Sequence, residues 1–405
     1  MYLRYLKLVR EYRNLIIIGG GAAGNSLARR IENGEITVIE RKEIIGEPAE
    51  CAGLVSKKSL ELMDIDLDES NFIQNRIYGA YIHSPKGEIY QIGGDRLHAY
   101  AIDRGRFDRF LADVAKRRGA EYILGAEAKE ISREDNKIVV RTTSGEFEAD
   151  IVVGADGIES IVRKTFFDEE PEEILFGIGA EVEGVEIDPR YVHVFFGKRL
   201  TPDFFAWMIP INEKGDKARI GLCVAHPPDR PPKRLLHDLL NYPTTKALLE
   251  KVEIINVIAG RIPLGYIRKS VIDNALLIGD SAFQIKPVSG GGIYPIAEAS
   301  RICAEVLNKA LERRNFSEKV LREYHIRWSE RLKREILFGL WVRKKYRNMG
   351  DEDIERFLSY LKRDDIVEIV NKYGDIDHPS RLILPLTKKF PTMISILPKI
   401  VGLFF

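Results

Sequence analysis

A glycine-rich turn between a short apolar strand and a helical stretch constrains the fold of this chain most strongly. Residues 14–18 read NLIII, a β-branched run typical of a buried parallel strand. The turn at 19–24 reads GGGAAG and has the G-x-G-x-x-G spacing. A second strand is predicted at 36–40 and ends in an acid, Glu40. Together these segments predict a compact β-turn-α-β unit.

The turn suits the pyrophosphate of a dinucleotide. Gly19, Gly21 and Gly24 permit a tight turn and a close approach of the backbone to phosphate. The helix that begins there offers free N–H groups and the positive end of its dipole. Glu40 is placed to accept hydrogen bonds from the adenosine ribose hydroxyls. This pattern predicts a dinucleotide site, but it does not separate FAD from NAD.

Composition excludes several classes of protein. The 405 residues are 45% hydrophobic and 30% charged, which predicts two or three folded domains. A net charge of +1 lacks the basic excess of a nucleic-acid binder, so no nucleic-acid partner is expected. Cys51, Cys223 and Cys303 are too scattered for a zinc or iron–sulfur site, and no metal is expected. So sparse a set of cysteines is typical of a reducing cytoplasm, and no apolar run reaches about 18 residues.

The chain divides into three predicted regions. The dinucleotide-binding domain is expected to be discontinuous, over 14–170 and 263–310, because buried-strand character returns after the middle of the chain. Residues 171–262 are expected to form an inserted antiparallel sheet that binds substrate, and residues 311–405 a helical C-terminal region. A strongly amphipathic helix is predicted at 104–121. The predicted fold class is therefore α/β, with a Rossmann-type domain.

Three further segments favour FAD over NAD. They are Arg104 at the start of the long helix, Asp156 after a strand, and Asp280 shortly before a glycine-rich turn at 287–292. This set resembles the FAD-dependent reductase and hydroxylase superfamily of the p-hydroxybenzoate hydroxylase type. The resemblance implies that the late aspartate contacts the ribityl chain or phosphate side of the flavin. It also implies that the glycine-rich helix start faces the isoalloxazine ring.

Three motifs make the chain similar to the geranylgeranyl reductase family, in particular the archaeal digeranylgeranylglycerophospholipid reductases. The segment GEPAECAG places Cys51 where that family has a cysteine near the flavin. The segment PDFFAWMIP at 202–210 resembles the signature P-x-x-Y-x-W-x-F-P, with Phe205 replacing its tyrosine and Ile209 its second phenylalanine. The segment PVSGGGIYPIAEASR at 287–301 resembles the family's flavin-proximal turn.

The resemblance implies an FAD-dependent reductase. Such an enzyme saturates carbon–carbon double bonds of geranylgeranyl chains in archaeal-type ether lipids or their precursors, by hydride transfer from reduced flavin. The alternative is an FAD-dependent monooxygenase of an aromatic or isoprenoid substrate, because it shares the three FAD segments. The expected partners are an isoprenoid lipid and an electron donor. Ferredoxin, a quinol-type donor and NADPH all remain open, since one G-x-G-x-x-G unit leaves no second nucleotide domain.

Candidate site residues follow from these motifs. The catalytic candidates are Cys51, Trp207 and Tyr294, and the proton donor is Cys51, Tyr294 or an ordered water. Phe205, Trp207 and Pro210 are expected to bind substrate, because an apolar wall stabilises a prenyl chain by about 0.8 kcal/mol for each methylene that it buries. The alternative is that these residues belong to the core of the sheet. The cofactor-binding candidates are Gly19, Gly21, Ala23, Gly24, Glu40, Arg41, Cys51, Ala52, Leu54, Arg104, Ala128, Asp156, Gly279, Asp280, Pro287, Gly291, Gly292 and Ile293.

Both ends of the chain combine cations with apolar or aromatic residues. The C-terminal segment KKFPTMISILPKIVGLFF at 388–405 carries two prolines that interrupt it. We expect it to lie at a membrane interface or to cover the substrate tunnel, and the alternative is ordinary docking on the domain. The expected location is cytoplasmic, with peripheral contact at the inner face of the membrane.

Overall fold

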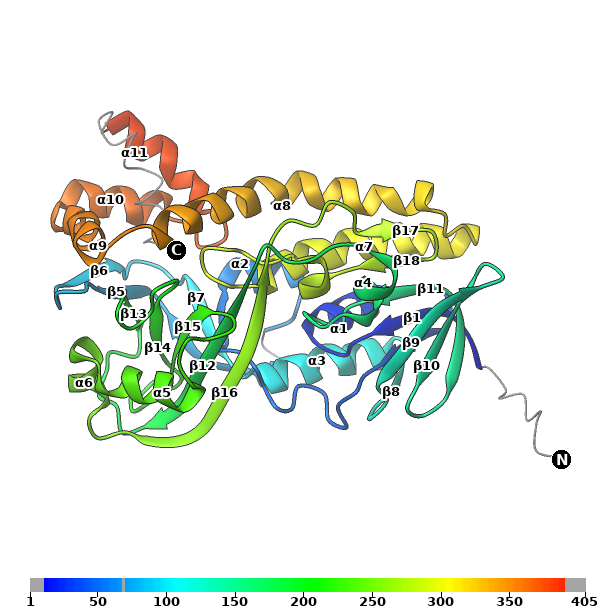
Figure 1. The fold of residues 1–405 in the computed structure, drawn as a ribbon, viewed down its shortest axis with the longest axis horizontal. Coiled ribbons are helices and arrows are strands. Elements are labelled where there is room, and N and C mark those ends of the chain that lie inside the picture. Colours follow the sequence, from blue (N-terminus) through cyan, green and yellow to red (C-terminus); the bar gives the residue numbers. More distant parts are fainter. Residues whose placement is uncertain (1–10, 68–69, 390–405) are drawn as a thin grey trace.

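The computed structural model describes residues 11–67 and 70–389. It contains two sheet-based halves that lie beside each other, with a layer of C-terminal helices across both (Figure 1). The C-terminal segment considered above as a membrane or tunnel contact lies outside the described residues from 390 onward, as do residues 1–10.

The first half is built on a sheet whose central strands are parallel. Its order is β17 (Val271–Ile272), β18 (Ala275–Leu277), β11 (Glu146–Gly154), β1 (Glu11–Ile18), β2 (Ile36–Ile39) and β8 (Glu121–Ile123). The strands from β18 to β8 are parallel, and β17 is antiparallel at the edge. β9 (Ala128–Glu134) and β10 (Lys137–Thr142) continue from β11 as an antiparallel meander. The predicted Rossmann-type arrangement is confirmed.

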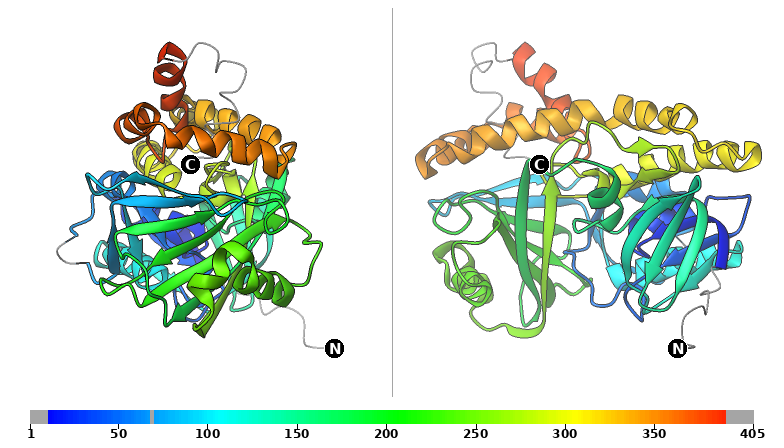
Figure 2. Two further views of the ribbon diagram at one scale, coloured as in Figure 1. Left: turned by 90° about the vertical axis from the view of Figure 1, so that its left-hand side faces the viewer. Right: turned by 45° about the vertical axis from the view of Figure 1, so that its right-hand side comes forward.

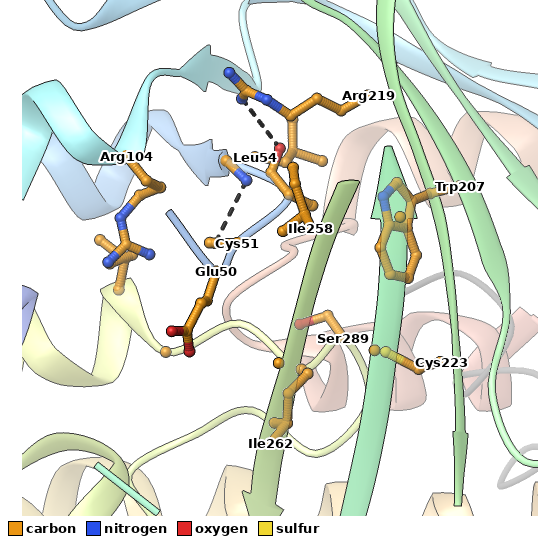
Figure 3. Close-up of a pocket in the computed structure, with 18 of the residues that line it drawn as sticks. Glu50, Cys51, Leu54, Arg104, Trp207, Arg219, Cys223, Ile258, Ile262 and Ser289 are labelled. Atoms are coloured by element: carbon orange, nitrogen blue, oxygen red, sulfur yellow. Dashed lines mark hydrogen bonds between the residues drawn. The ribbon is translucent and has the colours of Figure 1, made fainter. Parts of the chain in front are cut away.

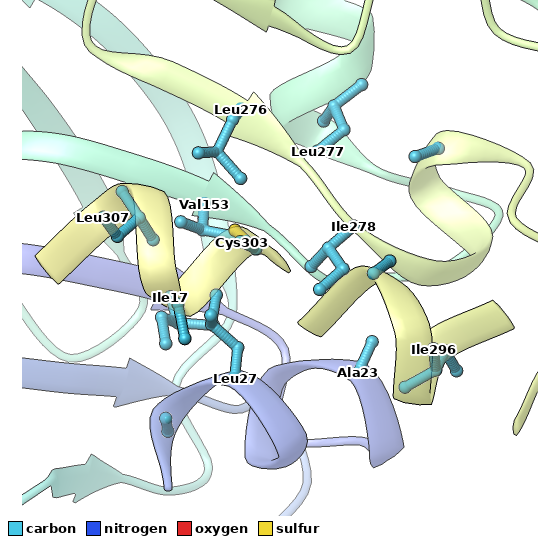
Figure 4. Packing of buried hydrophobic residues seen from close by; sticks show 14 of the residues in the cluster. Ile17, Ala23, Leu27, Val153, Leu276, Leu277, Ile278, Ile296, Cys303 and Leu307 are labelled. Atoms are coloured by element: carbon cyan, nitrogen blue, oxygen red, sulfur yellow. The ribbon is translucent and has the colours of Figure 1, made fainter. Parts of the chain in front are cut away.

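Helices cover this sheet. Buried side chains of β1, β11 and β18, among them Ile17, Val153 and Leu276, meet Leu27 of α1 (Ala22–Ala28) and Leu307 of α7 (Ile293–Arg313) in one apolar cluster (Figure 4). α4 (Ile161–Phe166) contacts β9, β11 and β18. The predicted amphipathic helix is α3 (Arg104–Arg117). Asp103 is its N-cap residue, and the Asp103 side chain accepts the N–H of Arg106.

The second half is a seven-stranded sheet with the order β16 (Glu253–Leu264), β12 (Glu173–Glu183), β15 (Lys217–Ala225), β14 (Ala206–Pro210), β13 (Tyr191–Phe195), β5 (Gly79–His83) and β6 (Ile89–Gly93). All neighbouring strands are antiparallel except β13 and β5. Alternate residues such as Ile178, Ile220 and Leu222 pack in one core with α5 (Pro232–Asn241) and α6 (Pro243–Leu249). The opposite face of the sheet is turned toward the first half.

Two strands from the predicted dinucleotide-binding segment join the second sheet. Residues 79–93 were assigned to the dinucleotide-binding domain, but they form β5 and β6 of the second sheet. The sequences of these strands, GAYIH and IYQIG, do not indicate which sheet they join. Ile82 and Tyr90 of this hairpin are buried against C-terminal helices, so the pairing is decided by packing far along the chain.

A small sheet connects the two halves, with the strand order β3 (Leu54–Ser56), β7 (Ala99–Ile102) and β4 (Ile73–Ile77). The helix α2 (Lys57–Met63) directly follows β3 in the chain. The long helix α8 (Glu318–Arg347) then runs across both (Figure 2). Near its end, the Arg343 guanidinium lies 2.5 Å from the Glu173 carboxylate, and the Tyr346 hydroxyl donates to the carbonyl of Phe204 at 2.7 Å. These contacts fix the second sheet beneath the helix.

The C-terminal region continues from α8 over β5 and β6. It consists of α9 (Asp351–Leu358), α10 (Asp364–Tyr373) and α11 (Ile383–Lys389), with short 3-10 turns at Ser359–Lys362 and Pro379–Leu382. Among the helices of residues 11–67 and 70–389, none has both the length and the apolar character that a membrane span requires.

Candidate functional site

The two halves enclose a crevice of about 540 Å³. One wall is formed by the glycine-rich turn, α3 and the start of α7, and the other by the second sheet. Cys51 lies between Arg104 on one side and Trp207 on the other (Figure 3). Twelve of the predicted site residues line this space: Gly21, Ala23, Glu40, Cys51, Ala52, Leu54, Arg104, Phe205, Trp207, Asp280, Gly292 and Ile293.

At one end of the crevice, the glycines of the first turn have different tasks. A Cβ at Gly24 would overlap the carbonyl oxygen of Gly19, so this glycine permits contact between turn and helix. Gly19 has a φ of +104°, and a Cβ there would lie 2.7 Å from the carbonyl carbon of Ala155. A Cβ at Gly21 would instead meet no atom of the described chain within 4 Å. The open side of Gly21 is therefore where a phosphate has room to approach.

Glu40 lines the same end of the crevice, beside the glycine-rich turn. Its carboxylate accepts the N–H of Gly20 at 2.6 Å and the N–H of Lys42 at 2.9 Å. The buried carboxylate therefore orders the turn, and its remaining lone pairs face the crevice for a ribose hydroxyl. Arg41 is exposed and Ala128 begins the β9 meander, and neither lies in the crevice lining.

Arg104, Asp108 and Cys51 occupy the middle of the crevice. The Arg104 guanidinium donates to both oxygens of Asp108, at 3.2 and 3.3 Å. Burial opposes its charge, but the Asp108 carboxylate and the Cys51 sulfur outweigh burial and hold the Arg104 pKa above its ordinary value. The Cys51 sulfur accepts the N–H of Gly53 at 3.4 Å. A cation is therefore fixed beside the only predicted catalytic thiol.

Asp280 faces the crevice from the 3-10 turn Gly279–Ala282. Burial raises its pKa to about 6, although the charge of Arg104 acts in the opposite direction. Among the described residues, no group donates a hydrogen bond to its carboxylate. Gly279 has a φ of +72°, and a Cβ there would lie 2.6 Å from the Cβ of Ala23, so this glycine brings the turn against α1.

Some predicted cofactor residues support the crevice from outside it. Asp156 accepts hydrogen bonds from the Ser160 hydroxyl at 2.5 Å and the Ile161 N–H at 2.7 Å, and so it orders the start of α4. Gly291 accepts the N–H of Lys286 at 3.1 Å. The ring of Pro287 packs against α8, since a Cβ at Gly339 would lie 2.9 Å from it.

The opposite wall is aromatic and apolar. Trp207 of β14 and Phe205, just before this strand, line the crevice, and their rings meet edge-on with centroids 6.3 Å apart. Phe204 stacks on Phe205 at 4.2 Å. The indole of Trp207 lies against Gly221 of β15, where a Cβ would come within 2.7 Å of its Cε2. Pro210 is outside the lining, because the side chains of a strand alternate and Phe205, Trp207 and Ile209 share the crevice face.

Tyr294 does not reach the crevice either. Its hydroxyl lies 3.2 Å from Nε2 of His378 and donates to Glu298 at 3.4 Å, and burial raises its pKa. Successive residues of a helix are turned by about 100°, so Ile293 faces the crevice while Tyr294 faces the C-terminal region. Of the two residues predicted as proton donors, Cys51 lines the crevice and Tyr294 does not.

The crevice fits FAD by three independent observations. Four buried polar atoms of its lining have no hydrogen-bond partner within the described part of the chain: Arg104 Nε and Ser289 Oγ on the cofactor side, and Trp207 Nε1 and His193 Nε2 on the second sheet. Gly21 leaves space for phosphate, and the Asp280 carboxylate in the lining accepts no hydrogen bond from the described residues. Glu40 and Gly21 would hold the adenosine and pyrophosphate, and Arg104 and Asp280 the flavin half.

Comparison with known proteins agrees with this assignment. Residues 12–307 match the family described as FAD binding domain. An uncharacterized protein of Methanocaldococcus jannaschii is 32% identical over 94% of this chain and 96% of its own length. A digeranylgeranylglycerophospholipid reductase of Methanosarcina acetivorans is 30% identical over 87% of this chain and 89% of its own.

Solved structures share the fold. A geranylgeranyl bacteriochlorophyll reductase-like protein of Thermoplasma acidophilum has a TM-score of 0.83 at 23% identity, covering 96% of this chain and all of its own. The halogenase PltM, solved in complex with FAD, has a TM-score of 0.69 at 13% identity and covers 96% of this chain and 88% of its own. At these identities the likeness concerns the fold alone.

The fold and the crevice define a flavin-dependent oxidoreductase with FAD as its cofactor. The chain belongs to the FAD binding domain family and, within it, to the geranylgeranyl reductase family.

Arg219, Lys286 and Ile376 are among the lining residues that sequence reasoning missed. Arg219 is buried and donates to the carbonyls of Ala52 and Ile102 at 3.3 and 2.7 Å, which fixes the Cys51 loop to the second sheet. The signal for it was one cation inside the otherwise apolar run ARIGLCVA at 218–225. Lys286 and Ile376 gave no comparable signal, because they meet only through the C-terminal fold.

Removal of the Asp280 charge is expected to weaken FAD binding. Each charge-assisted hydrogen bond to its carboxylate is worth about 1.5–3 kcal/mol, so Asp280→Asn should lower the affinity at least tenfold. Hydroxyl donors favour the ionised form, whose pKa in the free protein is about 6. FAD affinity of the unchanged protein should therefore fall as pH drops below about 6 and stay level above it. Fluorescence titration of FAD against pH measures both effects, and the same pH dependence in Asp280→Asn would contradict the assignment.

Proposed function

We propose that this chain is an FAD-dependent reductase that saturates the carbon–carbon double bonds of geranylgeranyl chains in archaeal-type ether lipids or their precursors. The observation that carries the proposal is the pairing of two walls in one crevice: groups that fit FAD on one side, and an apolar aromatic wall centred on Trp207 on the other. The names of relatives such as the Methanosarcina acetivorans reductase support the same substrate class.

The apolar wall supplies binding and orientation. Trp207, Phe205 and Ile209 present one continuous apolar surface to the crevice, and their burial of a prenyl chain gives affinity without charge. The flat indole, held against Gly221, is suited to keep a planar double bond in a fixed position. The same surface excludes water from the reacting carbons.

The second carbon of the double bond needs a proton. When bound and reduced, FAD supplies the hydride to the first carbon. We assign the proton to Sγ of Cys51, which lies in the lining beside the Arg104 guanidinium. Cys223, the other thiol among the lining residues, is less suited because burial raises its pKa to about 12. The proposal also requires an electron donor, and the candidates are ferredoxin, a quinol and NADPH. It further requires contact with the membrane that holds the lipid.

The decisive experiment is an anaerobic incubation. The flavin is photoreduced without oxygen, digeranylgeranylglycerophospholipid is added, and the lipid is analysed by mass spectrometry. We expect a gain of two hydrogens for each reduced double bond, together with reoxidation of the flavin. If the lipid is unchanged without oxygen but gains an oxygen atom in air with NAD(P)H, the monooxygenase alternative is correct.

A further inference from the structure

A buried ion pair joins the glycine-rich turn to the C-terminal region. The Lys286 ammonium donates to Oδ1 of Asp377 at 2.6 Å and to the carbonyl of Ile376 at 3.1 Å. The side chain of Asp377 is only 1% exposed, and its other oxygen accepts the Ser56 hydroxyl at 2.6 Å. A buried pair of this kind is strongly perturbed when one partner is removed, because the other charge then stays uncompensated.

The two charges of this pair stand at different depths relative to the crevice. Lys286 belongs to the lining, together with Gly290 and Gly292 of the same turn. Asp377 is not part of the lining and lies behind Lys286. A group bound in the crevice therefore meets the lysine first.

The flavin half of FAD belongs at this end. The open glycine and Glu40 place the adenosine and pyrophosphate at the other end, beside the first turn. The rest of the dinucleotide must then extend past Arg104 toward Asp280 and the turn that begins at Lys286. A charge near the ring system changes the electronics of a flavin, and the low dielectric of a buried site enlarges that effect.

We propose that the Lys286–Asp377 pair sets the reduction potential of the bound FAD. Lys286 is the cation that favours the more negative, reduced flavin, and Asp377 is the positioning residue that holds this cation and partly offsets its charge. The proposal rests on FAD as cofactor, and it does not depend on the alkene substrate of the proposed function.

The test measures the reduction potential without any lipid. The protein with bound FAD is photoreduced anaerobically beside a reference dye. Lys286→Met leaves an uncompensated carboxylate, so it should favour oxidised FAD about tenfold, a shift of about 30 mV to lower potential. Asp377→Asn leaves an uncompensated cation and should shift the potential in the opposite direction. The double variant Lys286→Met/Asp377→Asn should return close to the unchanged protein.

Lys58→Met is the matched control. Lys58 lies 3.5 Å from Asp375, the other acid of the same C-terminal loop, but it is not part of the crevice lining. Its removal takes a cation from the same neighbourhood and should leave the potential unchanged.

A purely structural pair would behave differently. Lys286→Met and Asp377→Asn would then lose melting temperature and FAD content together, without opposite shifts in potential. Shifts of the same sign, no shift in variants with normal FAD content, or an equal shift in Lys58→Met would overturn the proposal. Loss of FAD from every variant, including the charge-preserving Lys286→Arg, would likewise assign the pair a structural role only.

Discussion

Trp207→Ala is expected to slow alkene-dependent reoxidation of reduced flavin by about tenfold or more while FAD stays bound, because a small misplacement of reacting groups has large kinetic costs. The groups that fit FAD lie on the opposite wall, and the indole nitrogen has no hydrogen-bond partner among the described residues. Its loss should therefore remove orientation of the double bond without opening the cofactor site. Single-turnover reoxidation, FAD content and melting temperature are measured on one preparation.

Two further substitutions make this result specific. Gly221→Ala should displace the indole, because the new Cβ would lie 2.7 Å from its Cε2, and should reproduce part of the slowing. Trp328 is fully buried and donates to the Ser270 hydroxyl at 3.1 Å. Trp328→Ala should instead cost about 3–5 kcal/mol of stability and reduce FAD content with it. Normal reoxidation in a stable, FAD-loaded Trp207→Ala variant would remove Trp207 from the site.

Gly24→Ala is expected to destroy the dinucleotide site. Its Cβ would overlap the carbonyl oxygen of Gly19, and backbone atoms cannot escape by a change of rotamer. A cost at the upper end of the 1–3 kcal/mol typical of over-packing would weaken FAD binding roughly a hundredfold and lower the melting temperature of the free protein. Calorimetric titration with FAD and thermal unfolding of FAD-free protein provide the two measurements.

Gly21→Ala separates packing from ligand contact. Its Cβ would meet no atom of the described chain within 4 Å, and the backbone φ of −83° accepts an alanine. The FAD-free variant should melt like the unchanged protein, yet bind FAD more weakly because the methyl group takes the space of the phosphate. Gly350→Ala, also in open space but remote from the crevice lining, should change neither property. Full FAD affinity in Gly21→Ala would place the pyrophosphate elsewhere.

Local patterns predicted the elements of the first half well. The NLIII strand, the glycine turn, Glu40 and the amphipathic helix each depend on residues within a few turns of one another. The period of a strand or helix and the steric freedom of glycine act over this range. The same patterns could not show that Pro210 faces away from the crevice or that Tyr294 faces His378, because the orientation of an element depends on what packs against it.

The sequence by itself determined that this chain binds a dinucleotide next to an antiparallel sheet and that it resembles the geranylgeranyl reductases. Only the tertiary structure decided that β5 joins β13, that Arg219 holds the Cys51 loop, and that Lys286 pairs with Asp377. These partners are separated by about a hundred residues or more along the chain. Their meeting depends on burial and charge pairing in the folded molecule, which no local period encodes.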